Sequence, residues 1–299
     1  MMPAASTRFE EWKARFNEGK RSARAFFRSP LSTMGLSIAL IFFLISIIAP
    51  YITPYPEDVT GSVHTRERLK PPSSEHLFGT DDVGRDIFSR VLCGTRISLE
   101  IALVIIGVAV VIGVPLGLLA GFYGGAVEET IMRLTDIFLA VPGIVLAVTI
   151  VSALGPGIIN TMIAISLVWW PGYVRLVHGK TKALREETFV EASRAIGASR
   201  LRIIFSHILP NCSSIIVIKA SMDVGMAILH AAGLGFIGIG TQPPTPEWGA
   251  MISGGRWYLP TWWWYAVFPG MAIWFTVLGF NLLGDGLRDV LDPRSRGRY

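Results

Sequence analysis

The stretch that comes nearest to a catalytic motif in this chain is Gly172 to Thr181, which ends in Gly-Lys-Thr. A phosphate-binding loop needs four residues between its first glycine and the Gly-Lys pair, so that backbone N–H groups can surround the phosphate. Here six residues separate Gly172 from Gly179, and the stretch follows a long apolar run rather than a strand. The sequence therefore predicts that this chain does not bind ATP by itself.

The sequence also lacks the patterns of metal sites and hydrolase sites. It contains no His-Glu-x-x-His, Cys-x-x-Cys or Gly-x-Ser-x-Gly, so no metal site and no catalytic residue is predicted. Cys93 and Cys212 match no metal spacing and fall on different parts of the predicted topology. A multi-pass membrane enzyme, the alternative class, would have to use Asp223, His230 or His178.

Lys219, Asp223 and His230 lie within one predicted membrane span. Lys219 and Asp223 are four residues apart, so they share a helix face and can neutralise each other. Charged side chains inside a membrane are costly, so such a pair is expected at a cavity or at a subunit interface. The sequence leaves both alternatives open, a translocation pathway and a structural pair. For His230, a packed or hydrogen-bonded histidine is favoured over a ligand.

The elements that must position these residues are membrane-spanning helices. The chain has 299 residues, a mean hydropathy of +0.50 and only 16% charged residues, which excludes an ordinary soluble domain. A span needs about 20 apolar residues. The stretches that qualify are Leu31 to Pro56, Ile101 to Val127, Ile137 to Val174 (two spans folded at residues 155–157), Ile208 to about Gly240, and Trp257 to Gly284. We therefore predict an all-α polytopic membrane protein with six transmembrane helices.

The placement of lysine and arginine predicts the orientation of these helices. Nineteen of the 27 lie in residues 1–30, in residues 175–202, in the tail from Arg288 onward and at Arg133, whereas seven lie in the other loops. Because cytoplasmic loops are enriched in Lys and Arg, both termini and residues 175–202 are predicted to be cytoplasmic. The net charge of +5 then reflects topology, and no basic-aromatic patch predicts binding of nucleic acid.

A short amphipathic helix is predicted between two of the spans. Thr188 and Glu191 have the Ser/Thr-x-x-Glu spacing of a capping box, and Gly197 suits a left-handed turn that would end the helix. The apolar residues that would share one face are Phe189, Ala192 and Ile196. Ser199 is expected to cap a second helix, which Pro210 would break. The helix pattern alone leaves open a loop helix that lies on the membrane surface.

Around this helix the sequence resembles the EAA loop of ABC-importer permeases. The features of that loop are Glu-Ala-Ala, a glycine a few residues later, and Ile-x-Leu-Pro. The residues that match it here are Glu191, Ala192, Ser193, Ala195, Gly197, Leu209 and Pro210. In that family the helix, here at about residues 188–198, is the coupling helix, which sits in a groove of the cytoplasmic ATPase subunit.

Two further stretches resemble the dipeptide/oligopeptide branch of the same family, specifically its C-type subunit. One is the extracytoplasmic signature within His76 to Leu99, and the other runs from Gly284 to Pro293. The residues that carry the first are Gly79, Asp81, Gly84, Arg85 and Asp86. Its glycines allow tight turns and its charged residues offer ion pairs. From the residues alone, an amphipathic helix on the outer surface is the alternative for this stretch.

The resemblance implies one permease subunit of an ABC importer with the type I permease fold, in the cell membrane. The implied partners are a B-type permease in a heterodimer, two ABC ATPase subunits that bind ATP and Mg²⁺, and an extracytoplasmic solute-binding protein. The chain itself would hold no cofactor and would not be an enzyme. The implied cargo is a dipeptide or oligopeptide, although the same branch includes nickel, glutathione and oligosaccharide systems.

The expected organisation has five parts. They are a cytoplasmic segment (1–30), a first transmembrane helix (31–53), an extracytoplasmic segment (54–96), a five-helix permease domain (97–286) and a cytoplasmic tail (287–299). Near the end of the fifth helix the family often shows Glu-Ala-x-Leu-Ser-Phe-Leu-Gly, whereas here Ala231 and Gly235 replace the acid and the serine. If this region touches the substrate, the departure makes specificity for peptides less secure than the resemblance to the family implies.

Several residues inside the spans also carry expectations. Glycines repeat every four residues at 113, 117, 121 and 125, which predicts a stripe where a second helix approaches closely, in this chain or in a partner. Kinks are expected at Pro115, Pro142 and Pro171. Asp136 is expected to cap the third span. Arg96 and Glu100 are expected to form an ion pair at the outer rim.

Overall fold

The computed structural model describes residue 24 and residues 26–291, and in this part of the chain every regular element is a helix, as predicted. The long helices are α2 (Pro30–Ile52), α4 (Ile87–Tyr123), α5 (Gly125–Ala140), α6 (Gly143–Leu154), α7 (Ile158–Arg185), α10 (Leu209–Ile237) and α12 (Trp264–Leu291). The short ones are α3 (Glu57–Thr60), α8 (Thr188–Ala195), α9 (Arg200–Ile203) and α11 (Trp248–Gly255), with 3-10 turns at Thr65–Glu67 and Arg256–Tyr258 and a π-helix at Ile204–Ile208. Most of the predicted segment 1–30, and Pro293 with most of the predicted tail, lie outside the described residues.

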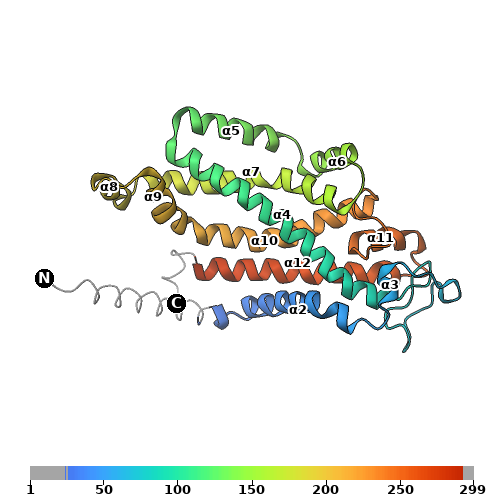
Figure 1. The fold of residues 1–299 in the computed structure, drawn as a ribbon. Helices are drawn as coiled ribbons and strands as arrows, with labels where there is room; N and C mark the ends of the chain where they lie inside the picture. Colours follow the sequence, from blue (N-terminus) through green and yellow to red (C-terminus); the bar gives the residue numbers. More distant parts are fainter. Residues whose placement is uncertain (1–23, 25, 292–299) are drawn as a thin grey trace.

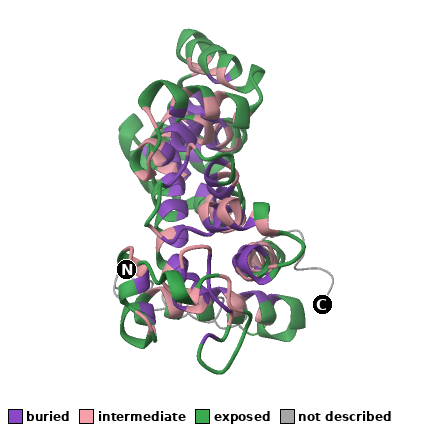
Figure 2. Cartoon of the chain, turned by 90° about the vertical axis from the view of Figure 1, so that its right-hand side faces the viewer, coloured by how far each residue is buried: buried purple, intermediate pink, exposed green. Residues whose placement is uncertain are grey.

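The helices α2, α4, α7, α10 and α12 lie along one bundle, and α5 lies outside α4 and α7 (Figure 1). The start of α2 and the end of α12 lie at the same end as α8 and α9, which we call the α8 end. The helices α3 and α11 lie at the opposite end, which we call the α11 end. Seen along the bundle, exposed residues surround a buried interior, as expected of helices that face lipid (Figure 2).

Four helical runs are long and apolar enough to cross a membrane, namely α2, α4, residues 200–237 and α12. The helices α5 and α6 together make a fifth, which is bent by 86°. The 28 residues of α7 are enough to span, although Lys182 and Arg185 make its last turn polar. The described residues thus supply four candidate spans, or five with the bent pair, and the predicted all-α membrane fold is confirmed, whereas the predicted number of six spans requires α7 as well.

The second span begins earlier than predicted, at Ile87 rather than at Ile101. Asp86 caps α4 by accepting a hydrogen bond from the Ser89 N–H (2.7 Å), and the helix continues through the charged residues that follow. The predicted division between residues 96 and 97 therefore falls inside α4.

The third span also begins earlier than predicted, at Gly125 rather than at Ile137, because charged residues again lie inside a helix. Pro142 separates α5 from α6, so the expected kink is a sharp bend between two helices. The predicted reversal at residues 155–157 is confirmed, with φ of 93° at Gly155 and 145° at Gly157.

The prediction that Pro210 breaks the helix is wrong. Residues 200–237 form one helical run, and the π-helix Ile204–Ile208 stands just before the proline. A proline clashes with the carbonyl four residues earlier, and a wider π turn at that point shifts the register of the helix. Ser199 caps the run as predicted and accepts a hydrogen bond from the Arg202 N–H (3.4 Å).

Three glycines bring α4 into close contact with α7, and they confirm the predicted stripe as a contact within this chain. A Cβ placed on Gly113, Gly117 or Gly121 would lie 2.6–2.8 Å from a backbone carbonyl of α7. Those carbonyls belong to Trp170, Val174 and His178. Gly125 does not belong to the stripe, because it begins α5 with a φ of +53° and no atom lies within 4 Å of its Cβ position.

Candidate functional site

Gly197 ends α8 in the way that the sequence predicts. Its φ is +81°, its N–H donates to the Arg194 carbonyl (3.0 Å), and the Ala198 N–H donates to the Ser193 carbonyl (3.0 Å). These two bonds form a Schellman turn, which favours glycine at the left-handed position. No atom lies within 4 Å of a Cβ built on Gly197, so the backbone angle, rather than space, requires glycine there.

The predicted capping box at the start of α8 is wrong. The cap position is Glu187, which is extended and makes no side-chain hydrogen bond, and Thr188 already belongs to the helix. Because α7 ends at Arg185, only Glu186 lies between that helix and the cap. The short connection to α7 therefore sets the start of α8, and reciprocal side-chain bonds do not.

One face of α8 is buried and the other is exposed. Val190 and Ser193 are buried, and Val190 joins an apolar cluster that includes Phe122, Leu184 and Ile203. The exposed residues of the helix and its turn include Phe189, Glu191, Ala192, Ala195 and Ile196, of which Ile196 is 85% exposed. The predicted apolar face thus points away from its own chain, where it offers contact area to a partner.

Three arginines fasten the α8 region to the end of α4. The guanidinium of Arg194 lies 5.6 Å from the ring centroid of Phe122, and that of Arg200 lies 5.7 Å from the ring centroid of Tyr123. Arg185 donates from Nη1 to the Phe122 carbonyl (3.4 Å). All five residues line an open groove of about 670 Å³. Movement of α8 would therefore act directly on α4.

The structure places five of the seven predicted coupling residues together, in α8 or at its end. They are Glu191, Ala192, Ser193, Ala195 and Gly197. Leu209 and Pro210 lie beyond the π-helix at the start of α10, where Leu209 packs against the cluster beneath α8 and Pro210 is exposed. Leu209 therefore supports the α8 region from below.

Lys219 and Asp223 form the predicted ion pair on α10. The Lys219 Nζ lies 3.0 Å from Asp223 Oδ2 and 5.2 Å from the ring centroid of Tyr173 on α7. The Lys219 side chain is 30% exposed and that of Asp223 is 12% exposed. The pair therefore links α10 to Tyr173 on α7, while Lys219 stays partly exposed. This geometry agrees with both predicted alternatives, a translocation pathway and a structural pair.

Two other predicted polar residues have partners of their own. The His230 Nδ1 lies 2.8 Å from the Met226 carbonyl oxygen, and its ring meets Trp169 edge-on at 4.8 Å. This agrees with a packed, hydrogen-bonded histidine. Asp136 is not a helix cap, since it lies near the end of α5 and its Oδ1 is 2.6 Å from Arg175 Nη2 on α7.

Replacing Lys219 with Met should harm the protein more than replacing both members of the pair (Lys219→Met with Asp223→Leu). The single change leaves Asp223 partly buried without its cation, at a cost of roughly 1–3 kcal/mol, whereas the double change leaves an apolar helix face. Membrane yield and uptake in vesicles measure the difference. A double variant that assembles but transports nothing would place the charges in the pathway, and normal uptake by every variant would exclude both roles.

The signature that the sequence predicts to be extracytoplasmic forms a set of tight turns before α4. Gly79 and Gly84 have φ of +74° and +87°. The buried Asp81 carboxylate accepts hydrogen bonds from the Arg85 N–H (2.9 Å) and from Arg85 Nε (2.7 Å), and Asp86 caps α4. Residues 76–86 of this stretch contain no helix, whereas residues 87–99 are the start of α4. The helical half therefore continues into the bundle instead of forming a separate surface helix.

Arg90 and Asp58 belong to the same network, and sequence reasoning missed both roles. Arg90 is 4% exposed and donates to the carbonyls of Asp58 (2.8 Å) and Pro244 (3.2 Å), while its Nε lies 3.8 Å from Asp81 Oδ2. The Asp58 Oδ2 accepts a hydrogen bond from the Asp86 N–H (2.8 Å). The carbonyl partners of Arg90 are 32 and 154 residues away along the chain, so no local pattern marks them.

Glu247 is a second residue that sequence reasoning missed. Its carboxylate caps α11 and accepts hydrogen bonds from the N–H groups of Gly249 (2.8 Å) and Ala250 (2.9 Å). Burial raises the pKa of Glu247 to about 7, against the lowering effect of these two bonds. A Cβ on Gly235 would lie 2.5 Å from Glu247 Oε2. The departure from the family pattern at Gly235 therefore makes room for this side chain.

The residues that a membrane enzyme would use are not assembled into one site. His178 pairs with Glu128 (2.8 Å), while Asp223 and His230 have the separate partners given above. The stretch Gly172 to Thr181 lies inside α7 and forms no loop. Within the described part of the chain, no group of three His, Cys, Asp or Glu residues could hold a metal ion.

Comparisons with known proteins identify the family to which this arrangement belongs. Residues 113–297 match the family described as binding-protein-dependent transport system inner membrane component, and residues 19–72 match the N-terminal TM domain of oligopeptide transport permease C. The solved structure of the MetNI methionine ABC transporter in an inward facing conformation has a TM-score of 0.55 and 22% identity, over 68% of this chain and 97% of that one. The fold is therefore that of an ABC transporter permease.

Similar curated proteins cover nearly the whole chain. A probable D,D-dipeptide transport system permease of Escherichia coli K12 is 46% identical over 90% of each chain. A dipeptide transport system permease of Alkalihalophilus pseudofirmus is 44% identical over 97% of this chain and 92% of its own. A glutathione transport system permease of Pectobacterium atrosepticum is 44% identical over 91% and 90%. With several membrane-length helices and these matches, the chain belongs to the family of binding-protein-dependent transport system inner membrane components.

Proposed function

We propose that this chain is the C-type permease subunit of an ABC importer for short peptides. The relatives described above are named for dipeptides, D,D-dipeptides and glutathione, which supports a cargo of this size and chemistry. The same architecture importing nickel or oligosaccharides is the alternative. Thermal shift of the cognate solute-binding protein with a dipeptide, glutathione or Ni²⁺ would distinguish these cargoes.

The proposed assembly places the α8 end in the cytoplasm, together with both termini. A B-type permease would complete the heterodimer, and two ABC ATPase subunits, which hold ATP and Mg²⁺, would dock at α8. An extracytoplasmic solute-binding protein would deliver the cargo at the α11 end. The distribution of lysine and arginine supports this orientation.

The observation that carries this proposal is the exposed apolar face of α8, held in place by the Gly197 turn and the stacked arginines. A helix fixed at both ends can transmit force, because it cannot rotate freely when a partner moves. When the ATPases close, they would displace α8 and with it α4 and α7, and the bundle would change which side of the membrane has access to the pathway. In that mechanism Lys219 and Asp223 line the pathway or the permease interface.

Gly197→Val should uncouple the ATPases from transport. The change forces a β-branched residue into a left-handed conformation, at a cost of about 1–2 kcal/mol or more, and so misdirects α8. We expect the ATPases to dissociate or to lose stimulation by loaded binding protein, with insertion of the spans unchanged. Co-purification, stimulated ATP hydrolysis and uptake in reconstituted vesicles measure the three effects.

Matched variants separate coupling from general destabilisation. Gly238 ends α10 at the α11 end with a φ of +93° and with no atom within 4 Å of its Cβ position, so Gly238→Val imposes similar strain far from α8. We expect that variant to keep its ATPases, and Gly197→Asn to restore coupling, since asparagine tolerates this conformation. Ile196→Asp should weaken ATPase binding about tenfold without strain. Wild-type coupling in both Gly197→Val and Ile196→Asp would show that the contact surface lies elsewhere.

A further inference from the structure

A groove between α2 and α4, toward the α11 end, has no part in the proposed transport mechanism. Its volume is about 670 Å³. Phe43 and Ile47 from α2 and Leu103 from α4 form apolar walls, and each of these side chains is 50–53% exposed. Tyr51, Arg96 and Glu100 also line it. The groove thus combines apolar walls with one aromatic hydroxyl and two charged groups.

Arg96 and Glu100, the two charged residues of the groove, do not form an ion pair with each other. The ion pair expected between Arg96 and Glu100 is absent, and among the described residues no hydrogen bond or salt bridge engages either side chain, although both are exposed. An arginine that precedes an acid by four residues is the less favourable order for a helical pair. A positive and a negative group, one helical turn apart, are therefore available to an external ligand.

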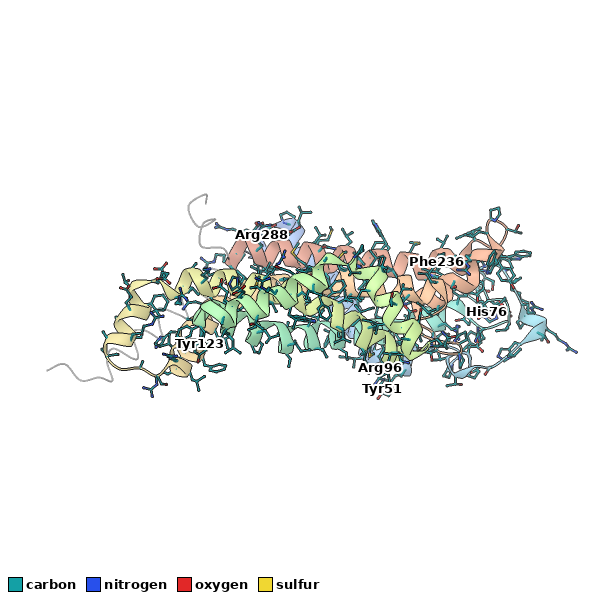
Figure 3. All side chains as sticks on the ribbon, turned by 90° about the horizontal axis from the view of Figure 1, so that it is seen from above. Tyr51, His76, Arg96, Tyr123, Phe236 and Arg288 are labelled. Carbon is teal, nitrogen blue, oxygen red and sulfur yellow. The ribbon has the colours of Figure 1, made fainter. Side chains whose placement is uncertain are left out.

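The position of Arg96 and Glu100 along α4 corresponds to the headgroup level of a membrane. Glu100 is the last charged residue before Tyr123 at the end of α4, and at about 1.5 Å per residue the stretch between them is roughly 35 Å long. The hydrocarbon core of a bilayer is about 30 Å thick. Tyr51, 87% exposed, has the place of an interfacial aromatic residue, and it lies near Arg96 at the same edge of the bundle (Figure 3).

We propose that this groove binds one zwitterionic phospholipid whose headgroup carries a primary ammonium. The phosphate would bind Arg96, and an acyl chain would lie along Phe43, Ile47 and Leu103. Because Glu100 lies between Arg96 and Leu103 on α4, the ethanolamine arm would fold back beside the phosphate to bring its ammonium to Glu100. Residues four apart on a helix have Cβ atoms about 5–6 Å apart, so both side chains can reach a phosphate and an ammonium joined by two carbons. An anionic headgroup would leave Glu100 beside a like charge, and a quaternary ammonium cannot donate hydrogen bonds to it.

The test is lipid retention by the full chain, purified with its partner subunits. The complex is placed in nanodiscs of equal parts phosphatidylethanolamine, phosphatidylcholine and phosphatidylglycerol, and the retained lipids are measured by native mass spectrometry. We expect one phosphatidylethanolamine per chain, enriched about tenfold over phosphatidylcholine, the ratio for one charge-assisted hydrogen bond. The double variant Arg96→Gln with Glu100→Gln should lose that enrichment.

A second pair of variants tests the apolar part of the groove. Leu103→Trp fills the groove and should displace the lipid with the charges intact. Val111→Trp places the same side chain on the same helix outside the groove, where Val111 is 72% exposed, and should retain it. Equal retention by the wild type and the double variant, equal binding of phosphatidylcholine, or a preference for phosphatidylglycerol would overturn the proposal. Absence of any retained lipid, as when a partner subunit covers the groove, would do so too.

Discussion

Gly113→Leu should prevent the chain from accumulating in the membrane as a folded protein. A Cβ at this position would lie 2.6 Å from both the Trp170 carbonyl oxygen and the Tyr173 Cβ, so α4 and α7 would have to move apart. Forcing extra atoms into a packed interior costs typically 1–3 kcal/mol, and here backbone rather than a flexible side chain has to yield. Membrane-inserted yield and the melting temperature of a fluorescent fusion would measure the loss.

The control for this prediction lies on the same helix. No atom lies within 4 Å of a Cβ on Gly107, so Gly107→Leu makes the same change of residue without a collision. We expect it to behave as the wild type in yield and melting temperature. If Gly113→Leu also matched the wild type, the close contact between α4 and α7 would not exist in the membrane.

Arg90→Gln should disrupt the whole α11 end of the molecule. The guanidinium contacts Asp58, Asp81 and Pro244, so its loss leaves two carbonyls without their donor and removes one of the two cations beside the buried Asp81 carboxylate. Breaking a buried charge network by removing one partner costs about 3–5 kcal/mol. We expect a strong fall in melting temperature and exposure of residues 53–86 to protease, and Arg90→Lys should recover only part of the loss.

Arg133→Gln is the matched control for Arg90. The Arg133 side chain is 76% exposed and, within the described residues, pairs with Glu129 alone, so its removal should change stability by less than about 1 kcal/mol. Equal melting temperatures for the Arg90 and Arg133 variants would mean that the network is not a stabilising element.

The sequence predicted the helices, the Ser199 cap and the end of α8, and it failed at the starts of α4, α5 and α8 and at long-range polar contacts. Charge-free stretches mark where a helix meets lipid, but α4 and α5 continue past that limit, because Asp86 and Gly124–Gly125 set their starts instead. Gly197 was predictable because a left-handed stop depends on a single residue. The capping box at Thr188 was not, since the connection from α7 determined which residue became the cap.

Among the polar residues, too, the sequence predicted some contacts and missed others. Lys219 and Asp223 were recognisable because four-residue spacing places two side chains on one helix face, although Arg96 and Glu100 have the same spacing and do not pair. Asp136 was assigned to a cap, and its true partner, Arg175, lies on another helix. Arg90 and Glu247 were missed because their environment consists of segments that only the folded chain brings together. Spacing can therefore predict which residues share a face of an element, but it does not identify their partners on other elements.

In the proposed mechanism, the tight contact between α4 and α7 would make the two helices move as one rigid arm. The arm would pivot at the α11 end, where Arg90 and Asp86 hold the start of α4, and would be displaced at α8, which follows α7 after two residues. The 37 residues of α4 make this arm about 55 Å long at about 1.5 Å per residue. A push of about 5 Å at α8 then corresponds to a tilt of roughly 5°. Such a rigid arm would move the α8 end of the bundle much further than the α11 end.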